Sequence, residues 1–177
     1  AVRHLLATGD LMVDEHGRWS GDVRRAATAP GVQGLVAARI ASLAPDALDV
    51  LATAAVIGAS FDLALLGDAL DGGLGRAVDV VDAAIHAHLV RPLPDRPGAC
   101  RFGHGLVRDA ILDAVTPPRR MALHRRVGLA LESTASGDRV RELADHFVEA
   151  APLGERDRAV QYSLEAAETA IRSLEYE

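Results

Sequence analysis

Apolar residues recur at helical spacing along most of this chain, and that pattern restricts the fold more than any other feature. The clearest stripe consists of Leu48, Leu51, Ala52, Ala55 and Val56, which follows the i, i+3, i+4, i+7 order of one helix face. Only 3% of the residues are aromatic although 49% are hydrophobic, so alanine, valine and leucine must fill the core. Because small aliphatic side chains suit closely packed helices better than a sheet sandwich, we predict a mainly α fold.

Glycine and proline residues divide the first half of the chain into short helices. The expected helices span residues 32–43, 46–57, 62–70 and 74–88. Gly58 closes the second helix, Asp62 is a candidate N-cap of the third, and Gly72–Gly75 breaks the chain before the fourth. The segment 11–20 ahead of them predicts a small hairpin that turns at residues 15–17.

Residues 89–93 and 99–102 have the pattern of two strands on either side of a turn. The turn sequence PDRPG at 94–98 holds two prolines and a glycine, which favour a chain reversal. Three helices followed by a hairpin, over 46–103, is the order of a winged-helix domain with a small β-wing. A helix from His104 to about Val115 extends this domain, and we assign it residues 30–116.

The last third of the chain predicts helices only. A helix capped by Thr116 and Pro117 runs to about Ser133, and two further helices form an αα-hairpin. Their expected apolar stripes are Leu143, Ala144, Phe147, Val148 and Ala151 on the first, and Val160, Ser163, Leu164, Ala167, Ala170, Ile171 and Leu174 on the second. We therefore assign 117–177 to a helical linker and the start of TPR-like repeats.

The charged residues and the cysteine content exclude several classes of function. All 19 basic residues are arginine, and a P-loop needs a lysine on the phosphates, so this chain is not a P-loop ATPase by itself. Cys100 is the single cysteine, which excludes an internal disulfide and a cysteine-rich zinc site. No apolar run approaches the ~20 residues of a membrane span, and no signal peptide is recognisable. We expect a soluble, cytoplasmic protein without a membrane partner.

The segment RFGHGLVRDAIL at 101–112 places a glycine-flanked histidine between a strand and a helix. A side chain at such a turn can face a ligand held by another domain, and helix N-termini attract phosphate. Arg108 follows His104 by one helical turn and Arg101 precedes it, so both are candidate phosphate contacts. The alternatives are a His104 that is hydrogen-bonded to the backbone and arginines that are solvated or paired with Asp109 or Asp113.

Other candidate sites are weaker. Arg39, inside an apolar helix, is a candidate contact to a nucleotide or a domain interface, or it snorkels from the helix edge. One basic run lacks interleaved aromatic residues, and we interpret it as a solvated helix face; it consists of Arg119, Arg120, His124, Arg125 and Arg126. The helix at 74–88 would be the recognition helix of a DNA-binding winged helix, but it carries two aspartates and one arginine. We expect no direct nucleic-acid binding, and we find no catalytic set and no metal pair.

Four consecutive blocks resemble the STAND-type regulatory ATPases, the large bacterial LuxR-, MalT- and SARP-like transcription regulators. The blocks are GVQGLVAARIASL at 31–43, AAVIGASFDLALL at 54–66, RFGHGLVRDAIL at 101–112 and LHRRVGLALE at 123–132. In that family a P-loop domain and a small helical domain precede a winged-helix domain, and helical repeats follow. The resemblance implies that residues 1–29 are the tail of the small helical subdomain and a linker.

The resemblance also implies a role for His104. The family's winged helix folds back on the nucleotide domain, and the histidine of its Met-His-Asp motif contacts the β-phosphate of ADP in the resting state. His104 matches that histidine, whereas Gly103 and Gly105 replace the methionine and the aspartate. ADP or ATP would then be bound mainly by the N-terminal domain of a larger parent protein, with His104 and the three arginines named above as contacts from this chain.

The implied partners are the parent's own nucleotide-binding domain, an inducer or protein bound by the helical repeats, and further copies of the parent. Exchange of ADP for ATP would release the resting state and allow assembly. Two alternatives stay open from the residues. One is a helical protein–protein interaction domain in which His104 is structural, and the other is a DNA-binding winged helix.

Overall fold

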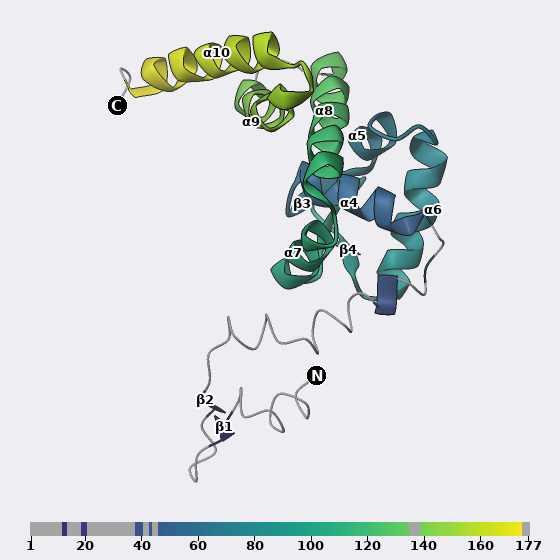
Figure 1. Cartoon of the computed structure of the whole chain (residues 1–177). Coiled ribbons are helices and arrows are strands. Elements are labelled where there is room, and N and C mark those ends of the chain that lie inside the picture. The colour runs from purple at the N-terminus through teal and green to yellow at the C-terminus, as the bar shows by residue number, and fades with distance from the viewer. Residues whose placement is uncertain are drawn as a thin grey trace.

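Helices predominate in the computed structural model of the chain (Figure 1). The structure describes residues 12–13, 19–20, 38–40, 43, 46–134 and 139–174. A small three-stranded antiparallel sheet accompanies the helices, so the expected mainly α class is confirmed. Strands β1 (Met12–Val13) and β2 (Trp19–Ser20) pair antiparallel, which confirms the hairpin expected over 11–20. Most of the helix expected over 32–43 lies outside the described residues.

Residues 46–115, called the core part below, hold the sheet and the helices around it. Its elements are α4 (Ala47–Ile57), β3 (Ser60–Asp62), α5 (Leu63–Asp68), α6 (Gly73–His86), β4 (Val90–Pro92), β5 (Ala99–Phe102) and α7 (Gly105–Asp113). Strand β5 lies between β3 and β4 and pairs antiparallel with both. The β4–β5 hairpin was predicted, whereas β3 was not, because three residues are too few to show a strand's alternation.

Local signals explain where these elements begin and end. The backbone N–H of Gly58 donates to the Ala54 carbonyl and closes α4. The Asp62 carboxylate accepts a hydrogen bond of 2.8 Å from the Ala64 N–H and caps α5 as expected. The break before α6 lies at Gly73, whose φ of 65° favours glycine. Gly75 lies inside α6, so the expected break over 72–75 was too long.

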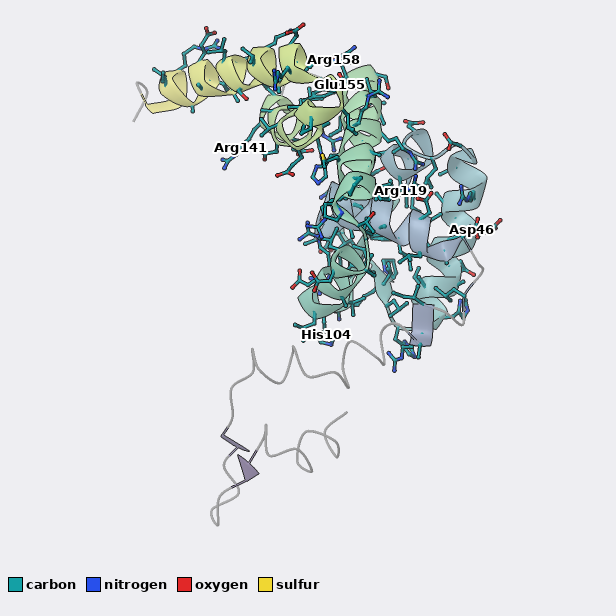
Figure 2. The ribbon with its side chains drawn as sticks, in the orientation of Figure 1. Asp46, His104, Arg119, Arg141, Glu155 and Arg158 are labelled. Carbon is teal, nitrogen blue, oxygen red and sulfur yellow. The ribbon has the colours of Figure 1, made fainter. Side chains whose placement is uncertain are left out.

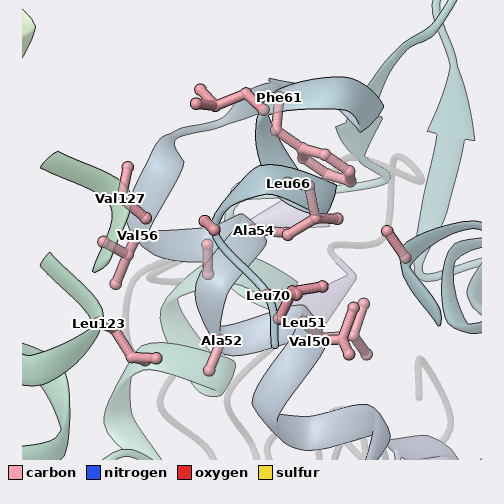
Figure 3. Close-up of a cluster of buried hydrophobic side chains, with 14 of the residues drawn as sticks. Val50, Leu51, Ala52, Ala54, Val56, Phe61, Leu66, Leu70, Leu123 and Val127 are labelled. Atoms are coloured by element: carbon pink, nitrogen blue, oxygen red, sulfur yellow. The ribbon is translucent and has the colours of Figure 1, made fainter. Parts of the chain in front are cut away.

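Helix α4 is the centre of the core. Its Val50 and Leu51 side chains are completely buried, and α5, α6, α7 and α8 all pack against it. The close-up in Figure 3 shows α4 residues beside Leu66 of α5 and Leu123 and Val127 of α8. The tilted rings of Phe61 and Phe102, 5.5 Å apart between centroids, belong to adjacent strands of the sheet. Aliphatic side chains fill most of this core, as the composition predicts.

Helix α8 (Pro117–Thr134) joins the core part to three further elements (Figure 1). These are α9 (Val140–Ala150), the 3-10 turn η2 (Ala151–Leu153) and α10 (Arg156–Leu174), together called the C-terminal helix pair. Phe147 of α9 is fully buried and packs against Gly128 of α8. A Cβ atom at Gly128 would lie 3.1 Å from the Phe147 ring, so glycine permits this close approach.

Three apolar residues of these helices are exposed, and one of them, Val148, belongs to a stripe that we expected to be buried. Val78 is 44% exposed because α6 turns Ala77, Val80 and Val81 toward the core instead. Ala114 is exposed because α7 ends at Asp113 and only Val107 and Ile111 of that helix are buried. Val148 is 52% exposed, because α9 buries the neighbouring Phe147.

The largest correction concerns α10. The stripe expected to pack in the helix pair is exposed: Val160 is 59%, Leu164 62% and Ile171 58% accessible. Instead, Ala159 is buried and Tyr162 packs against the core with its ring stacked on Phe147, at 5.5 Å between centroids. Helix α10 packs through the face that carries Tyr162, because this face combines the stacking with a hydrogen bond to α8. The aliphatic face cannot make such a hydrogen bond.

Among the described residues, no helix is both long enough and apolar enough to cross a bilayer. In the same part of the chain, no cluster of three or more histidine, cysteine, aspartate or glutamate side chains has the arrangement of a metal site.

Candidate functional site

His104 is the N-terminal cap residue of α7 and lies on the surface. Its backbone is extended (φ −143°, ψ 149°), and its side chain makes no capping hydrogen bond. Within the described residues the imidazole has no hydrogen-bond partner, and the residue is exposed. The backbone-bonded, structural histidine that we considered from the sequence is therefore not what the structure shows. Figure 2 places His104 at the end of the molecule remote from Glu155 and Arg158.

The turn before α7 is held in place by the sheet. The Gly103 N–H donates to the Leu89 carbonyl over 2.8 Å, and Phe102 just before it is buried. A Cβ atom at Gly103 would lie 3.1 Å from the His88 carbonyl oxygen. A glycine at this position thus lets the turn lie against the chain after α6, and it fixes where His104 leaves the sheet.

A hollow of about 320 Å³ lies beside His104. Its lining residues come from the end of α6, from β4 and from the turn before α7; they are Ile85, His88, Val90, Arg91, Gly103 and His104. The Arg91 guanidinium donates to the Gly103 carbonyl over 3.1 Å. None of these six residues is acidic, while two are histidines and one is an arginine.

Arg101 extends the positive character of this surface. It lies directly opposite Arg91 in the β4–β5 ladder, so both side chains leave the same face of the sheet, and both residues are exposed. Two adjacent guanidinium groups repel each other unless an anion lies between or near them. The positive end of the α7 dipole points toward the same turn. This combination can hold an anionic group such as a phosphate.

Of the four predicted residues only His104 lines the hollow: Arg101 lies opposite Arg91 in the ladder, and the structure places Arg108 and Arg39 elsewhere. The Arg108 Nε donates to the Ala55 carbonyl over 2.8 Å, so this partly buried side chain ties α7 to α4 rather than pairing with Asp109 or Asp113. Arg39 lies in the described stretch 38–40, where it is exposed, and it does not line the hollow.

Sequence reasoning missed His88 and Arg91. Arg91 could have been found, because the predicted hairpin strands place it opposite Arg101 once their register is assumed. His88 has a positive φ of 58°, a backbone conformation that residues other than glycine seldom adopt. Nothing in the sequence around His88 indicates that backbone conformation.

The basic run on α8 is not the solvated face that we expected. Arg119 pairs with Asp49, and Arg120 donates to the Leu112 carbonyl over 2.6 Å. The other three members also have partners within the chain: His124 with His146, Arg125 with Glu155, and Arg126 with Ala69 and Asp49. These partners lie 8 to 77 positions away, so local sequence gives no sign of them.

Asp49 of α4 is the centre of one ionic cluster. Arg126 lies 3.5 Å and Arg76 3.9 Å from its carboxylate, in addition to Arg119. Burial alone would raise the pKa of Asp49, but the hydrogen bonds and charges of Arg119 and Arg126 outweigh it and lower that pKa. The cluster joins α4, α6 and α8, so these arginines form contacts within the fold.

Comparison with known proteins adds no assignment: no family model, curated protein or solved structure matches this chain.

Proposed function

We propose that this chain is the regulatory module of an ATP/ADP-switched transcription regulator of the STAND type. The core part would close over the nucleotide domain of the parent protein in the ADP state. The C-terminal helix pair would pass the signal of an inducer or partner to it. Exchange of ADP for ATP then favours release of the core part, because His104 contacts the nucleotide only in the closed state.

The order of elements in the core part supports this proposal. Helix α4, strand β3, helices α5 and α6, and strands β4 and β5 follow one another in the order of a winged-helix domain. The β5 strand lies in the middle of the sheet, as it does where the wing returns between the other two strands. The α9 and α10 helices that follow pack against each other, which supports the proposal that they form the start of TPR-like repeats.

The observation that carries the proposal is the exposed imidazole of His104, which has no hydrogen-bond partner in the described part of the chain. A histidine held at a helix N-terminus, in a hollow that Arg91 also lines, can donate to a phosphate oxygen from either ring nitrogen. Its rigid placement, set by Gly103 and the sheet, costs little additional ordering when the nucleotide domain presents ADP. The chain itself supplies one wall of such a site, and the parent's nucleotide domain would supply the other.

The surface of α6 argues against direct DNA binding. Its exposed side includes Leu74 at 53% and Val78 at 44% accessibility, together with the exposed Asp79 and Asp82. Apolar and acidic side chains are a poor match for a groove between phosphates. A mobility-shift assay of the chain with duplex DNA at low salt is expected to show no shift, and a salt-sensitive shift would contradict this.

A helical interaction domain is the second candidate function, and the exposed stripe of α10 favours it. Val160, Leu164 and Ile171 share one face and are each more than half exposed. An aliphatic stripe of this kind is how a helix packs into the groove of a partner or a further repeat. In this reading the core part serves as a support for the helix pair and the nucleotide plays no role.

The ADP content of the purified parent protein separates the two functions. We expect wild type to release ADP on denaturation and His104→Ala to release much less, with higher basal output in a reporter assay. His86→Ala is the matched control, because His86 is an exposed histidine on α6 that does not line the hollow. Equal ADP in all three proteins would overturn the nucleotide role of His104, and absence of ADP from all would favour the interaction domain.

A further inference from the structure

Two histidines face each other where the C-terminal helix pair meets α8. The Nδ1 atoms of His124, on α8, and His146, on α9, lie 3.1 Å apart, and the ring centroids are separated by 5.1 Å. His146 is only 6% exposed, and His124 is partly buried. Within the described residues neither ring has another hydrogen-bond partner, so this contact is the polar link at the centre of the α8–α9 interface.

The geometry of the contact requires that at least one of the two rings be neutral. A hydrogen bond between two Nδ1 atoms needs one Nδ1 that carries a proton and one that does not. A ring protonated on both nitrogens can still be the donor, but if both rings are protonated, both Nδ1 atoms become donors that point at each other over 3.1 Å. The hydrogen bond is then lost, and two positive charges lie in a buried interface.

We propose that the His124–His146 pair is a proton-sensitive joint, which holds the C-terminal helix pair on α8 only while at least one of the two imidazoles is neutral. The pair is separate from the hollow beside His104, so the joint stands whether or not that site binds a nucleotide. Its effect is to make the position of α9 and α10 depend on pH.

The surroundings of the pair oppose a positive charge on His146. Burial, and then the neighbouring His124, lower the pKa of His146 to about 4. Burial also lowers the pKa of His124, and Arg120 and Arg108 act in the same direction. Glu149 and Asp145 of α9 act in the opposite direction, but the net shift is still downward. Burial of the pair therefore outweighs the two carboxylates of α9, and the joint favours neutral rings.

The sign of the pH effect follows from these shifts. In the unfolded or detached state His146 has its ordinary pKa of 6.5. At pH values between 6.5 and about 4 the detached state takes up a proton that the attached state rejects. Attachment is therefore fully stable above about pH 6.5 and weakens as the pH falls below it. From about pH 7.5 to about pH 5 the equilibrium constant for detachment should rise about 30-fold.

A second hollow lies between α8 and α9, although neither histidine lines it. It has a volume of about 370 Å³ and is lined partly by Arg120 and Met121 of α8 and by Val148 and Glu149 of α9. His124 is itself partly exposed. A proton can thus reach the pair without complete unfolding of the core part.

Hydrogen exchange of the full chain, followed by mass spectrometry, tests the joint. After correction for the intrinsic pH dependence of exchange, amides of α9 and α10 should lose about 30-fold of their protection between about pH 7.5 and about pH 5. Amides of α4 should change far less. His146→Gln should remove most of the pH dependence, whereas His86→Gln, an exposed histidine on α6, should keep it.

A side-chain NMR titration of wild type keeps the test decisive if His146→Gln does not fold. We expect His146 to titrate near pH 4; titration near its ordinary value would overturn the joint. The same pH dependence of α9 and α10 exchange in wild type and in His146→Gln would also overturn it. Zinc is the remaining probe, and protection by zinc that a chelator reverses would make the pair a metal site instead.

Discussion

The core part and the C-terminal helix pair attach to opposite sides of α8 by different means. On the core side, α4 is buried along nearly its whole length and touches four helices through aliphatic side chains. On the other side, α10 buries little beyond Ala159 and leaves its large aliphatic residues exposed. The comparison teaches that burial of apolar surface sets the position of the core part, whereas directional polar contacts contribute much of what positions the helix pair.

These polar contacts are concentrated between α8 and the start of α10. The nearly buried Glu155 carboxylate accepts from Arg125 over 2.6 Å and from Arg158 over 2.8 Å. These two hydrogen bonds lower the pKa of Glu155. The Glu132 carboxylate accepts from both Arg158 and the Tyr162 hydroxyl. Such contacts depend on charge and geometry, so the attachment of the helix pair should respond to protons and salt.

The largest effects should come from truncating one fully buried side chain on each side of α8. Leu51→Ala and Phe147→Ala each remove a completely buried side chain, and each should lower the free energy of unfolding by about 3–4 kcal/mol. The two variants should differ in which part of the chain loses protection from hydrogen exchange. Hydrogen exchange should show Leu51→Ala weakening the whole chain, while Phe147→Ala mainly releases α9 and α10.

The same hydrogen-exchange experiment can also show that the core part and the helix pair do not differ in this way. If Phe147→Ala lowers protection in α4 as much as in α9, then the helix pair and the core part unfold as one cooperative unit. The proposed joint would then report on global stability rather than on detachment.

A smaller effect is expected from the ionic cluster on the core side. Asp49→Asn removes the carboxylate that Arg119 and Arg126 share, and should cost about 1–2 kcal/mol at neutral pH, between the values for surface and buried pairs. The pKa of Asp49 is lowered below 3.8. Its contribution is therefore present above about pH 3.8 and is lost as the pH falls through the lowered value.

Urea unfolding near pH 7 and near pH 3 checks this prediction. Asp46→Asn is the matched control, because Asp46 is 48% exposed and bonds to Arg76 alone among the described residues. A cost at pH 3 as large as that at pH 7 would show that Asp49 acts through packing rather than through its charge.

Gly128→Ala should have a smaller effect again, on the helix-pair side. The new Cβ atom would lie 3.1 Å from the Phe147 ring, which is held by stacking on Tyr162. Overpacking should outweigh the gain in helix propensity, for a net loss of about 1 kcal/mol in thermal or urea unfolding. Gly75→Ala on α6 is the control, because its Cβ atom meets nothing within 4 Å; it should stabilise the chain slightly.

The sequence predicts most of the core part because its signals are local. The cap at Asp62 and the hairpin that turns at 94–98 both appear in the structure as expected. Only part of the candidate site beside His104 can be predicted from the sequence. His104 follows from its motif, whereas Arg91 joins it through strand pairing. The partners of the basic run on α8 lie too far along the chain for any local pattern to reveal them.

The predicted packed face of α10 was wrong for a different reason. A substitution on that face should give the smallest effect. Hydrophobicity favours Val160, Leu164 and Ile171 as the packed face, but packing and hydrogen bonding of Tyr162 decide the orientation. Leu164→Asn should then change the free energy of unfolding by less than about 0.5 kcal/mol, because Leu164 is 62% exposed. Leu143→Asn, at a position only 3% exposed, should cost several-fold more.

Leu164→Asn also separates the two candidate functions. In the parent protein the variant should keep its ADP, because the α10 stripe lies far from His104 (Figure 2). If the helix pair receives a partner through this stripe, the variant should fold normally yet lose its response to inducer. A loss of stability comparable to that of Leu143→Asn would mean that α10 packs through its aliphatic face after all. The interaction surface, and the contrast drawn between the two sides of α8, would then both be wrong.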